Sequence, residues 1–173
     1  MEDLRSLVRR SITEQILNPE KDFTEHKIAV RNHLSQEELS KLKFKLEVAV
    51  PIHLPPKSGK GTCRRVVDLV ENEFQRFGGG AQITSCRGSW LDEKGNSIVE
   101  SCVMVSTTAS LEKWHYSPPM LHSIIHKIQE LLFQQCVFVA VDGLPYGDPI
   151  DVVKKPYSYY PGIEDFQEID PLC

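Results

Sequence analysis

The amino-acid sequence predicts an α+β domain in which two strand–helix–strand halves share one antiparallel sheet, and three observations lead to this prediction. Residues 44–50 alternate apolar and polar side chains, which is typical of a half-buried strand. Residues 62–77 and 117–132 place apolar side chains at helical spacing. Between these helices, residues 81–108 contain two strand-like segments around the polar loop 92–96, as a β-hairpin does.

Length and composition fit a single domain with appendages. The chain has 173 residues, of which 40% are hydrophobic, and this is enough for an ordinary core. The formal net charge is −4. An acidic balance argues against a nucleic-acid-binding surface, which usually carries a basic patch or stripe. We therefore do not expect DNA or RNA as a partner.

Cysteine usage indicates a reducing compartment. The five cysteines, at positions 63, 86, 102, 136 and 173, include no C-x-x-C pair and are odd in number. The first segment of the chain is charged throughout, unlike a signal peptide. No apolar run approaches the length of a bilayer span. We expect a cytoplasmic protein with free thiols and no contact with a membrane.

Residues 1–42 are predicted to form a helical extension and linker. An amphipathic helix covers residues 3–17, and its apolar stripe is Leu4, Leu7, Val8, Ile12 and Ile16. The stripe favours docking on protein over a membrane surface, because acidic residues accompany its arginines. A linker is expected over 18–34. Ser35 followed by Glu38 is the capping box of a short helix over 36–42.

Residues 43–142 are predicted to form the main domain. Three glycines at 78–80 end its first helix, and the hairpin strands 81–91 and 97–108 follow. The last element is a near-continuous apolar run, 136–141, which is typical of an interior strand. The order strand, helix, strand, strand, helix, strand is the ferredoxin-like, split βαβ arrangement (βαββαβ). It implies a four-stranded antiparallel sheet with two helices on one face.

Residues 143–173 differ in composition from the rest of the chain. They are rich in proline and tyrosine, and after Lys155 they contain acidic residues but no basic ones. We expect an extended acidic C-terminal arm that wraps the domain or a partner.

The segment 58–62, Ser-Gly-Lys-Gly-Thr, resembles the second half of the phosphate-binding loop of adenylate-kinase-like enzymes. A strand precedes it and a helix follows it, as in those enzymes. However, Leu54 stands in place of the first glycine, and Pro55 and Pro56 supply no N–H for a phosphate. Such domains also need a parallel sheet, whereas a hairpin makes antiparallel neighbours. These departures favour an ordinary basic loop.

Anion binding at this loop remains an alternative. Lys57, Lys60, Thr62 and Arg64 surround the predicted start of a helix. Backbone N–H groups and basic side chains at such a position can hold a phosphate or a carboxylate.

His122 and His126 are candidate metal ligands. They lie four residues apart on a predicted helix, with Glu130 four residues further on, so all three share one stripe. With a fourth donor the stripe can hold zinc or another transition metal. It flanks the apolar face without a defined ligand set. We therefore predict a solvated helix face, with no metal and no other cofactor.

The uncovered face of the sheet offers a second candidate site, formed by Arg87, Trp90 and Glu100. A carboxylate beside apolar neighbours can have a raised pKa and act in proton transfer. His115, in the loop before the last helix, could reach the same face, so Glu100 and His115 are the catalytic candidates. The simpler interpretation, which we favour, is a cross-strand pair of Arg87 with Glu100 on an exposed sheet.

The progression Phe77-Gly78-Gly79, Gly88-Ser89-Trp90, Gly95 and Glu100 is similar to that of small bacterial proteins of unknown function that look ferredoxin-like. The resemblance covers residues 44–142, and it implies a fold rather than an activity.

The sequence favours a non-enzymatic binding or assembly module. An open sheet face and free edge strands expose apolar surface, so we expect self-association, or binding of a protein partner, through that face and the terminal arms. Two alternatives stay open. One is a small enzyme or ligand-binding protein that uses a pocket on the open sheet. The other is phosphate or nucleotide binding at residues 58–62.

Overall fold

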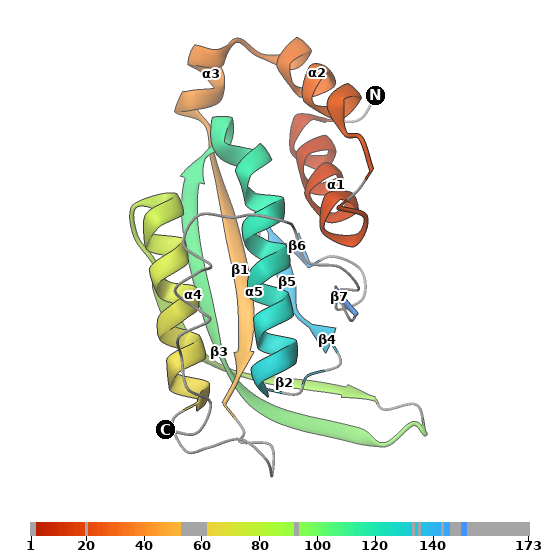
Figure 1. Ribbon diagram of the computed structural model, residues 1–173, viewed down its shortest axis with the longest axis vertical. Coiled ribbons are helices and arrows are strands. Elements are labelled where there is room, and N and C mark those ends of the chain that lie inside the picture. Colours follow the sequence, from red (N-terminus) through yellow and green to blue (C-terminus); the bar gives the residue numbers. More distant parts are fainter. Residues whose placement is uncertain are drawn as a thin grey trace.

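A computed structural model of the chain describes residues 3–19, 21–52, 62–91, 94–132, 134, 136–142, 144–145 and 150–151. They form a mixed α+β fold (Figure 1). The helices are α1 (Leu4–Leu17), α2 (Thr24–His33), α3 (Gln36–Lys41), α4 (Thr62–Gly78), the 3₁₀ helix η1 (Leu111–Tyr116) and α5 (Ser117–Leu132). The strands are β1 (Lys43–Pro51), β2 (Gln82–Leu91), β3 (Ser97–Ser110), β4 (Cys136–Val137), β5 (Val139–Val141), β6 (Leu144–Pro145) and β7 (Ile150–Asp151).

The main sheet has the strand order β2-β3-β1-β5-β6, and its neighbouring strands are antiparallel. β2 and β3 form the predicted hairpin, with Gly95 at a φ of +79° in the turn. β1 is central, since Val48 lies opposite Val105 of β3 and opposite Val139 of β5. β4 and β7 pair separately. The α+β class is confirmed, and β6 and β7 are the described part of the predicted arm 143–173.

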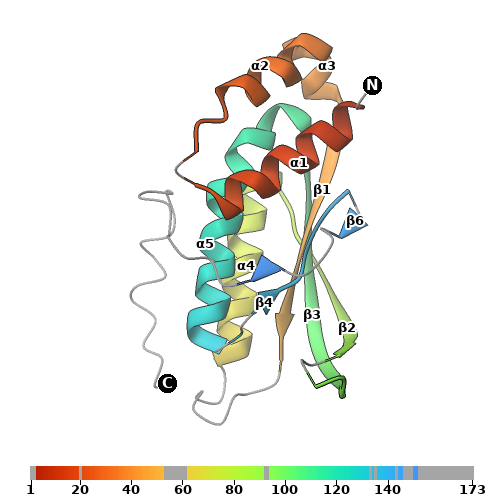
Figure 2. The ribbon, with the colours of Figure 1, turned by 90° about the vertical axis from the view of Figure 1, so that its right-hand side faces the viewer.

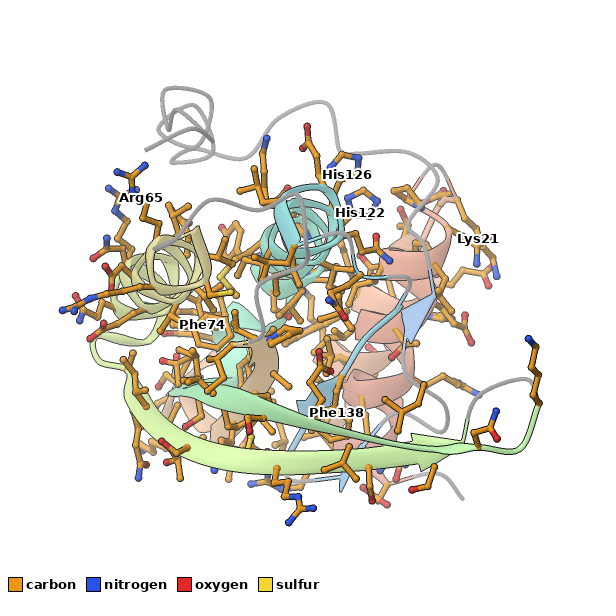
Figure 3. All side chains as sticks on the ribbon, turned by 90° about the horizontal axis from the view of Figure 1, so that it is seen from below. Lys21, Arg65, Phe74, His122, His126 and Phe138 are labelled. Atoms are coloured by element: carbon orange, nitrogen blue, oxygen red, sulfur yellow. The ribbon has the colours of Figure 1, made fainter. Side chains whose placement is uncertain are left out.

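Helices α4 and α5 lie side by side over one face of the main sheet (Figures 1 and 2). The alternation along β1 explains this layer, because every second side chain is buried under the helices: Phe44, Leu46, Val48 and Val50. Phe74 of α4 is fully buried and points toward the sheet (Figure 3). The opposite face of the sheet carries no helix in these views.

Helix α1 belongs to the same hydrophobic core as the sheet. Its buried apolar residues lie in one cluster with β1, α4 and α5: Leu7, Val8, Ile12 and Ile16. Arg5 of α1 also donates to the backbone oxygen of Lys43 (3.0 Å) and contacts the Asp142 carboxylate. The predicted apolar stripe therefore docks on protein. Within the described part of the chain, every helix is too short or too polar to span a bilayer.

The linker predicted over residues 18–34 is wrong, because α2 lies within it. This helix has no side-chain N-cap, and its apolar pattern is weak: Val30 is buried, whereas Ile28 is 52% exposed. Contact with α1 supports it, as the Ser11 hydroxyl lies 2.8 Å from Nδ1 of His26. Short helices depend on such tertiary packing, which leaves little trace in the sequence period.

The strand predicted over 136–141 is interrupted at Phe138. β4 before this residue pairs with β7, whereas β5 after it pairs with β1 and β6. At the break, the backbone N–H of Ala49 donates to the Phe138 carbonyl (3.1 Å). An unbroken apolar run cannot reveal this change of partner, because its composition is the same on both sides. The capping box of Ser35 and Glu38 at the start of α3 forms as predicted.

Candidate functional site

The sheet face opposite α4 and α5 is polar toward one end and contains sulfur near its middle. Antiparallel register sets side chains of neighbouring strands next to one another on this face. Starting at the polar end, the rows are Lys45 with Thr108, Glu47 with Ser106 and Gln82, Ala49 with Met104 and Thr84, and Pro51 with Cys102 and Cys86. This face therefore lacks the continuous apolar surface that sheet-to-sheet self-association would need.

An open pocket of about 410 Å³ lies at the polar end of this face. The turn between α4 and β2 forms one wall, and short polar side chains of three strands form the rest. The lining residues are Lys45, Gly78, Gly79, Gly80, Ala81, Gln82, Ser106, Thr107 and Thr108. Segments that are far apart in the sequence thus meet here through the register of the sheet.

The glycine turn is fixed tightly against β3. The Thr107 hydroxyl lies 2.6 Å from the carbonyl oxygen of Gly80, to which it donates. A Cβ at Gly78 would lie 2.0 Å from Thr107 Oγ1 and 2.8 Å from the backbone oxygen of Thr108. Gly79 has a φ of +86°, which other residues adopt only with strain. The pocket wall therefore has one defined backbone shape, and glycine is what permits it.

Protein donors occupy carbonyl groups at the C-terminal end of α4, next to the pocket. The ammonium group of Lys113 donates to the Phe77 carbonyl (3.0 Å). The backbone N–H of Gly79 donates to the Gln75 carbonyl (2.8 Å). These contacts offset the negative end of the helix dipole. Lys113 thus places a positive charge at the C-terminal end of the helix, next to the pocket.

Lys45 carries the charge in the pocket wall. Asp142 binds both the backbone N–H and the backbone carbonyl of Lys45. The Lys45 N–H donates to Oδ1 of Asp142 (3.0 Å), and the Lys45 carbonyl accepts from the Asp142 N–H (2.8 Å). Its Nζ lies 2.6 Å from Oε1 of Glu47, and these side chains are 44% and 17% exposed. A partly exposed ion pair of this kind contributes at most about 1 kcal/mol. An anionic ligand can therefore compete with Glu47 for the ammonium group.

Two cysteines face each other in the middle of the same sheet face. Cys86 of β2 and Cys102 of β3 are direct register partners, and their Sγ atoms are 2.7 Å apart. The pKa of the Cys102 thiol is raised to about 12, mainly by burial and secondly by the hydrogen bond with Cys86. Cys63 is buried near the start of α4, and burial raises the pKa of its thiol as well.

The structure does not bring Arg87 and Glu100 together. Arg87 lies opposite Ser101, and Glu100 lies opposite Gly88, so the two side chains leave opposite faces of the hairpin. The cross-strand pair favoured from the sequence is therefore wrong. Glu100 lies on the face of the two cysteines, and the side chain of Trp90 is outside the described part of the chain.

His115 does not share a site with Glu100. It lies in η1, beyond the far end of β3, and ten strand residues separate Glu100 from that end, a span of roughly 33 Å. Its ring packs on Tyr116, with 4.0 Å between the ring centroids. Burial is the main cause that lowers the pKa of His115, and the positive charges of Lys27 and Arg31 lower it further. The two catalytic candidates are thus separate.

Most of the candidate anion-binding loop lies outside the described residues, including Lys57 and Lys60. Thr62 is the first residue of α4, and its side chain is not described. Arg64 follows on the same helix with an exposed side chain. Anion binding at 58–62 therefore stays a prediction.

The predicted solvated histidine stripe is wrong for His122, which is fully buried at 0% exposure. His126 is partly exposed, and its Nδ1 lies 3.8 Å from Oε2 of Glu130. Both histidines project from α5 (Figure 3). This helix packs against α1 as well as α4, so a residue that flanks its apolar face is covered too. The described part of the chain holds no group of three or more His, Cys, Asp and Glu side chains suited to a metal ion.

Sequence reasoning missed the pocket residues Lys45, Gln82, Ser106 and Thr108. Each one is an ordinary polar position on an alternating strand, and nothing in the period distinguishes it. The available signal was the run of three glycines, which we interpreted only as the end of a helix. A run of this kind also marks a place where a backbone approaches another element closely.

The comparisons with known proteins give a limited likeness. No family model and no curated protein matches this chain. A solved structure of a phage SAM lyase in complex with S-methyl-5′-thioadenosine is 15% identical, with a TM-score of 0.44, and the match covers 67% of this chain and 93% of that one. The same lyase in its apo state is 17% identical, with a TM-score of 0.40 and coverages of 67% and 91%. A Bacillus cereus protein related to NIF3 is 11% identical, with a TM-score of 0.38 and coverages of 83% and 33%.

We correct the hypothesis of a non-enzymatic assembly module that self-associates through the open sheet face, because the polar character of this face speaks against such contact. The solved structures named above include an enzyme, the phage SAM lyase. At these identities and TM-scores, the likeness concerns the fold and transfers no activity to this chain.

Proposed function

We propose that this chain binds a small polar molecule with a carboxylate or phosphate group in the pocket beside the glycine turn. The observation that carries the proposal is the chemistry of the wall. Lys45, whose ammonium group is paired with Glu47, lines the pocket together with Ser106, Thr108 and Gln82, which carry hydroxyl and amide groups. Charge-assisted hydrogen bonds from such donors are the usual means of holding anionic oxygens.

The same wall supports binding more than catalysis. Among the described residues that line the pocket, Lys45 is the single titratable side chain. General acid–base chemistry most often uses histidine or a carboxylate, and the described lining residues include neither. The rigid glycine turn favours binding as well, because a preformed wall loses little entropy when a ligand enters.

We also infer that residues 43–142 form a ferredoxin-like unit. The chain order β1, α4, β2, β3, α5, β5 and the neighbour order β2-β3-β1-β5 support this assignment. Helices α1 to α3 and η1 are then additions to the unit. The pocket lies where the first helix of the unit returns to the sheet.

Thermal unfolding tests the proposal. Inorganic phosphate and malonate represent the two anion types, with sodium chloride at the same ionic strength as reference. A ligand at one hundred times its dissociation constant stabilises the native state by about 2.7 kcal/mol. For a chain of this size, that corresponds to a rise in Tm of roughly 5–11 °C.

Two lysines of β1 provide a matched pair of variants. Lys45→Gln removes the charge from the pocket wall, and the anion-induced rise in Tm should be lost. Lys43→Gln removes an exposed charge two residues away, outside the pocket, and the rise should persist. The proposal fails if neither anion raises Tm above the chloride reference, or if both variants respond equally.

A further inference from the structure

The cysteine pair on the open sheet face is a site that the proposed ligand pocket does not use. Cys86 and Cys102 are direct partners in the antiparallel ladder, and their sulfur atoms are 2.7 Å apart. Directly opposed residues of a ladder have Cα atoms about 4.5–5.5 Å apart. This range lies inside the roughly 4.4–6.8 Å that a disulfide spans. The backbone therefore needs no rearrangement to bring the two thiols into bonding range.

The two thiols differ in environment, and this difference assigns their roles. Cys102 is buried, whereas Cys86 on the edge strand is only half-buried. Burial and the contact with Cys86 raise the pKa of the Cys102 thiol to about 12, so this thiol ionises little near neutral pH. A thiolate is the attacking species in exchange reactions. The accessible thiol, Cys86, is therefore the one placed to react first.

We propose that Cys86 and Cys102 form a thiol–disulfide exchange site whose substrates are low-molecular-weight disulfides. The Cys86 thiolate attacks one sulfur of the external disulfide. A mixed disulfide forms at Cys86, and one external thiol leaves with a proton. Cys102 then loses its proton and attacks the Cys86 sulfur. The Cys86–Cys102 bond forms, and the second external thiol leaves. The protein gives up two electrons and two protons, which reduce the external disulfide to two thiols.

The site is independent of the anion pocket. Four residues along β2 separate Cys86 from Gln82, which is roughly 13 Å along a strand. Exchange at the cysteines needs no ligand in the pocket, and anion binding needs no change of the thiols. A failure of either proposal therefore leaves the other standing.

Oxidised glutathione is the probe, added to the reduced full-length protein, and tryptic mapping under non-reducing conditions is the assay. Trypsin cleaves after Arg76, Arg87, Lys94 and Lys113, so that Cys86 and Cys102 fall on different peptides. Each of the other three cysteines falls on a peptide of its own. The expected product is one linked pair of peptides, 77–87 with 95–113, lighter than their sum by two hydrogen atoms. Dithiothreitol should reverse it.

Single variants separate the two roles. Cys102→Ser removes the second nucleophile, so glutathione should remain attached to Cys86 as a stable mixed disulfide. Cys86→Ser removes the first nucleophile, so Cys102 should stay unmodified over the same time. Cys63→Ser is the matched control, because it removes a buried cysteine outside the pair and should leave the linked peptides unchanged.

The proposal is overturned if the wild type keeps glutathione on Cys86 without the linked peptides. It is overturned equally if Cys86 pairs with another cysteine, or if no cysteine of the pair reacts. Circular dichroism checks that each variant folds. If a serine variant does not fold, the peptide map of the wild type alone decides, since it contains no substitution.

Discussion

Replacing Gly78 by alanine should destabilise the protein, although glycine in a helix is usually unfavourable. The added Cβ would lie 2.0 Å from Thr107 Oγ1 and 2.8 Å from the backbone oxygen of Thr108. Overpacking of this kind costs about 1–3 kcal/mol. If Thr107 moves aside, its hydroxyl also loses the hydrogen bond that it donates to the Gly80 carbonyl, worth about 0.5–1.5 kcal/mol.

Helix propensity acts in the opposite direction, because alanine is favoured over glycine by about 1 kcal/mol within a helix. The expected net loss for Gly78→Ala is therefore about 0.5–3.5 kcal/mol, which is the sum of these terms. A chain of this length then melts roughly 1–14 °C lower. Urea denaturation and thermal unfolding measure the two quantities.

The neighbouring glycines are matched controls. A Cβ at Gly80 meets no atom within 4 Å and its φ is not positive, so Gly80→Ala should be neutral or stabilise by up to about 1 kcal/mol. Gly79→Ala should cost about 1–2 kcal/mol, because residue 79 has a positive φ. If Gly78→Ala proves as stable as Gly80→Ala, the close approach of α4 to β3 is refuted.

Three further predictions concern other parts of the fold. Ile12→Ala, in the buried stripe of α1, should lower the free energy of unfolding by about 2–5 kcal/mol. Leu17→Ala, at a residue that is 53% exposed, should change it by under about 0.5 kcal/mol. Equal urea midpoints for the two variants would contradict a core shared by α1 and the sheet. The pKa of His115 is lowered in the folded state, so the unfolded state binds its proton first, and stability should fall as pH decreases below about 6.5. His115→Gln should weaken this dependence, and identical urea midpoints for both proteins between pH 5 and 7.5 would exclude it. Asp142→Ala removes the acceptor of the Lys45 N–H and should cost about 1–3 kcal/mol, more than Asp142→Asn, which keeps an oxygen at that position; amide exchange at residue 45 is the readout.

The sequence predicted the elements whose pattern is local. Alternation over 44–50 and helical spacing over 62–77 reflect burial on one side, which each segment carries by itself. Helix α2 escaped prediction because only Val30 of its apolar side chains is fully buried. The change of partner at Phe138 escaped because pairing depends on neighbouring strands rather than on the apolar run.

The candidate site was harder to predict, because register creates it. Nothing in the sequence says that Lys45 faces Thr108, or that Cys86 faces Cys102, since a shift by one residue reverses the face of every side chain. His122 shows a related limit. Helical spacing gives the angle of His122 around α5 but does not say that α5 packs against α1 as well as α4, or that His122 is buried.

The position of β1 has a consequence for synthesis of the chain. β1 is complete at residue 51, but its two neighbours in the sheet, β3 and β5, begin at residues 97 and 139. Helix α1, complete at residue 17, also lacks a partner until late in synthesis, because α5, against which it packs, ends at residue 132. At about 5–20 residues per second, a ribosome leaves β1 without its second hydrogen-bonding neighbour for roughly 5–18 s before β5 is made. Nascent chains of this protein therefore expose a hydrophobic strand well before they can fold, and chaperones that bind such strands have time to act.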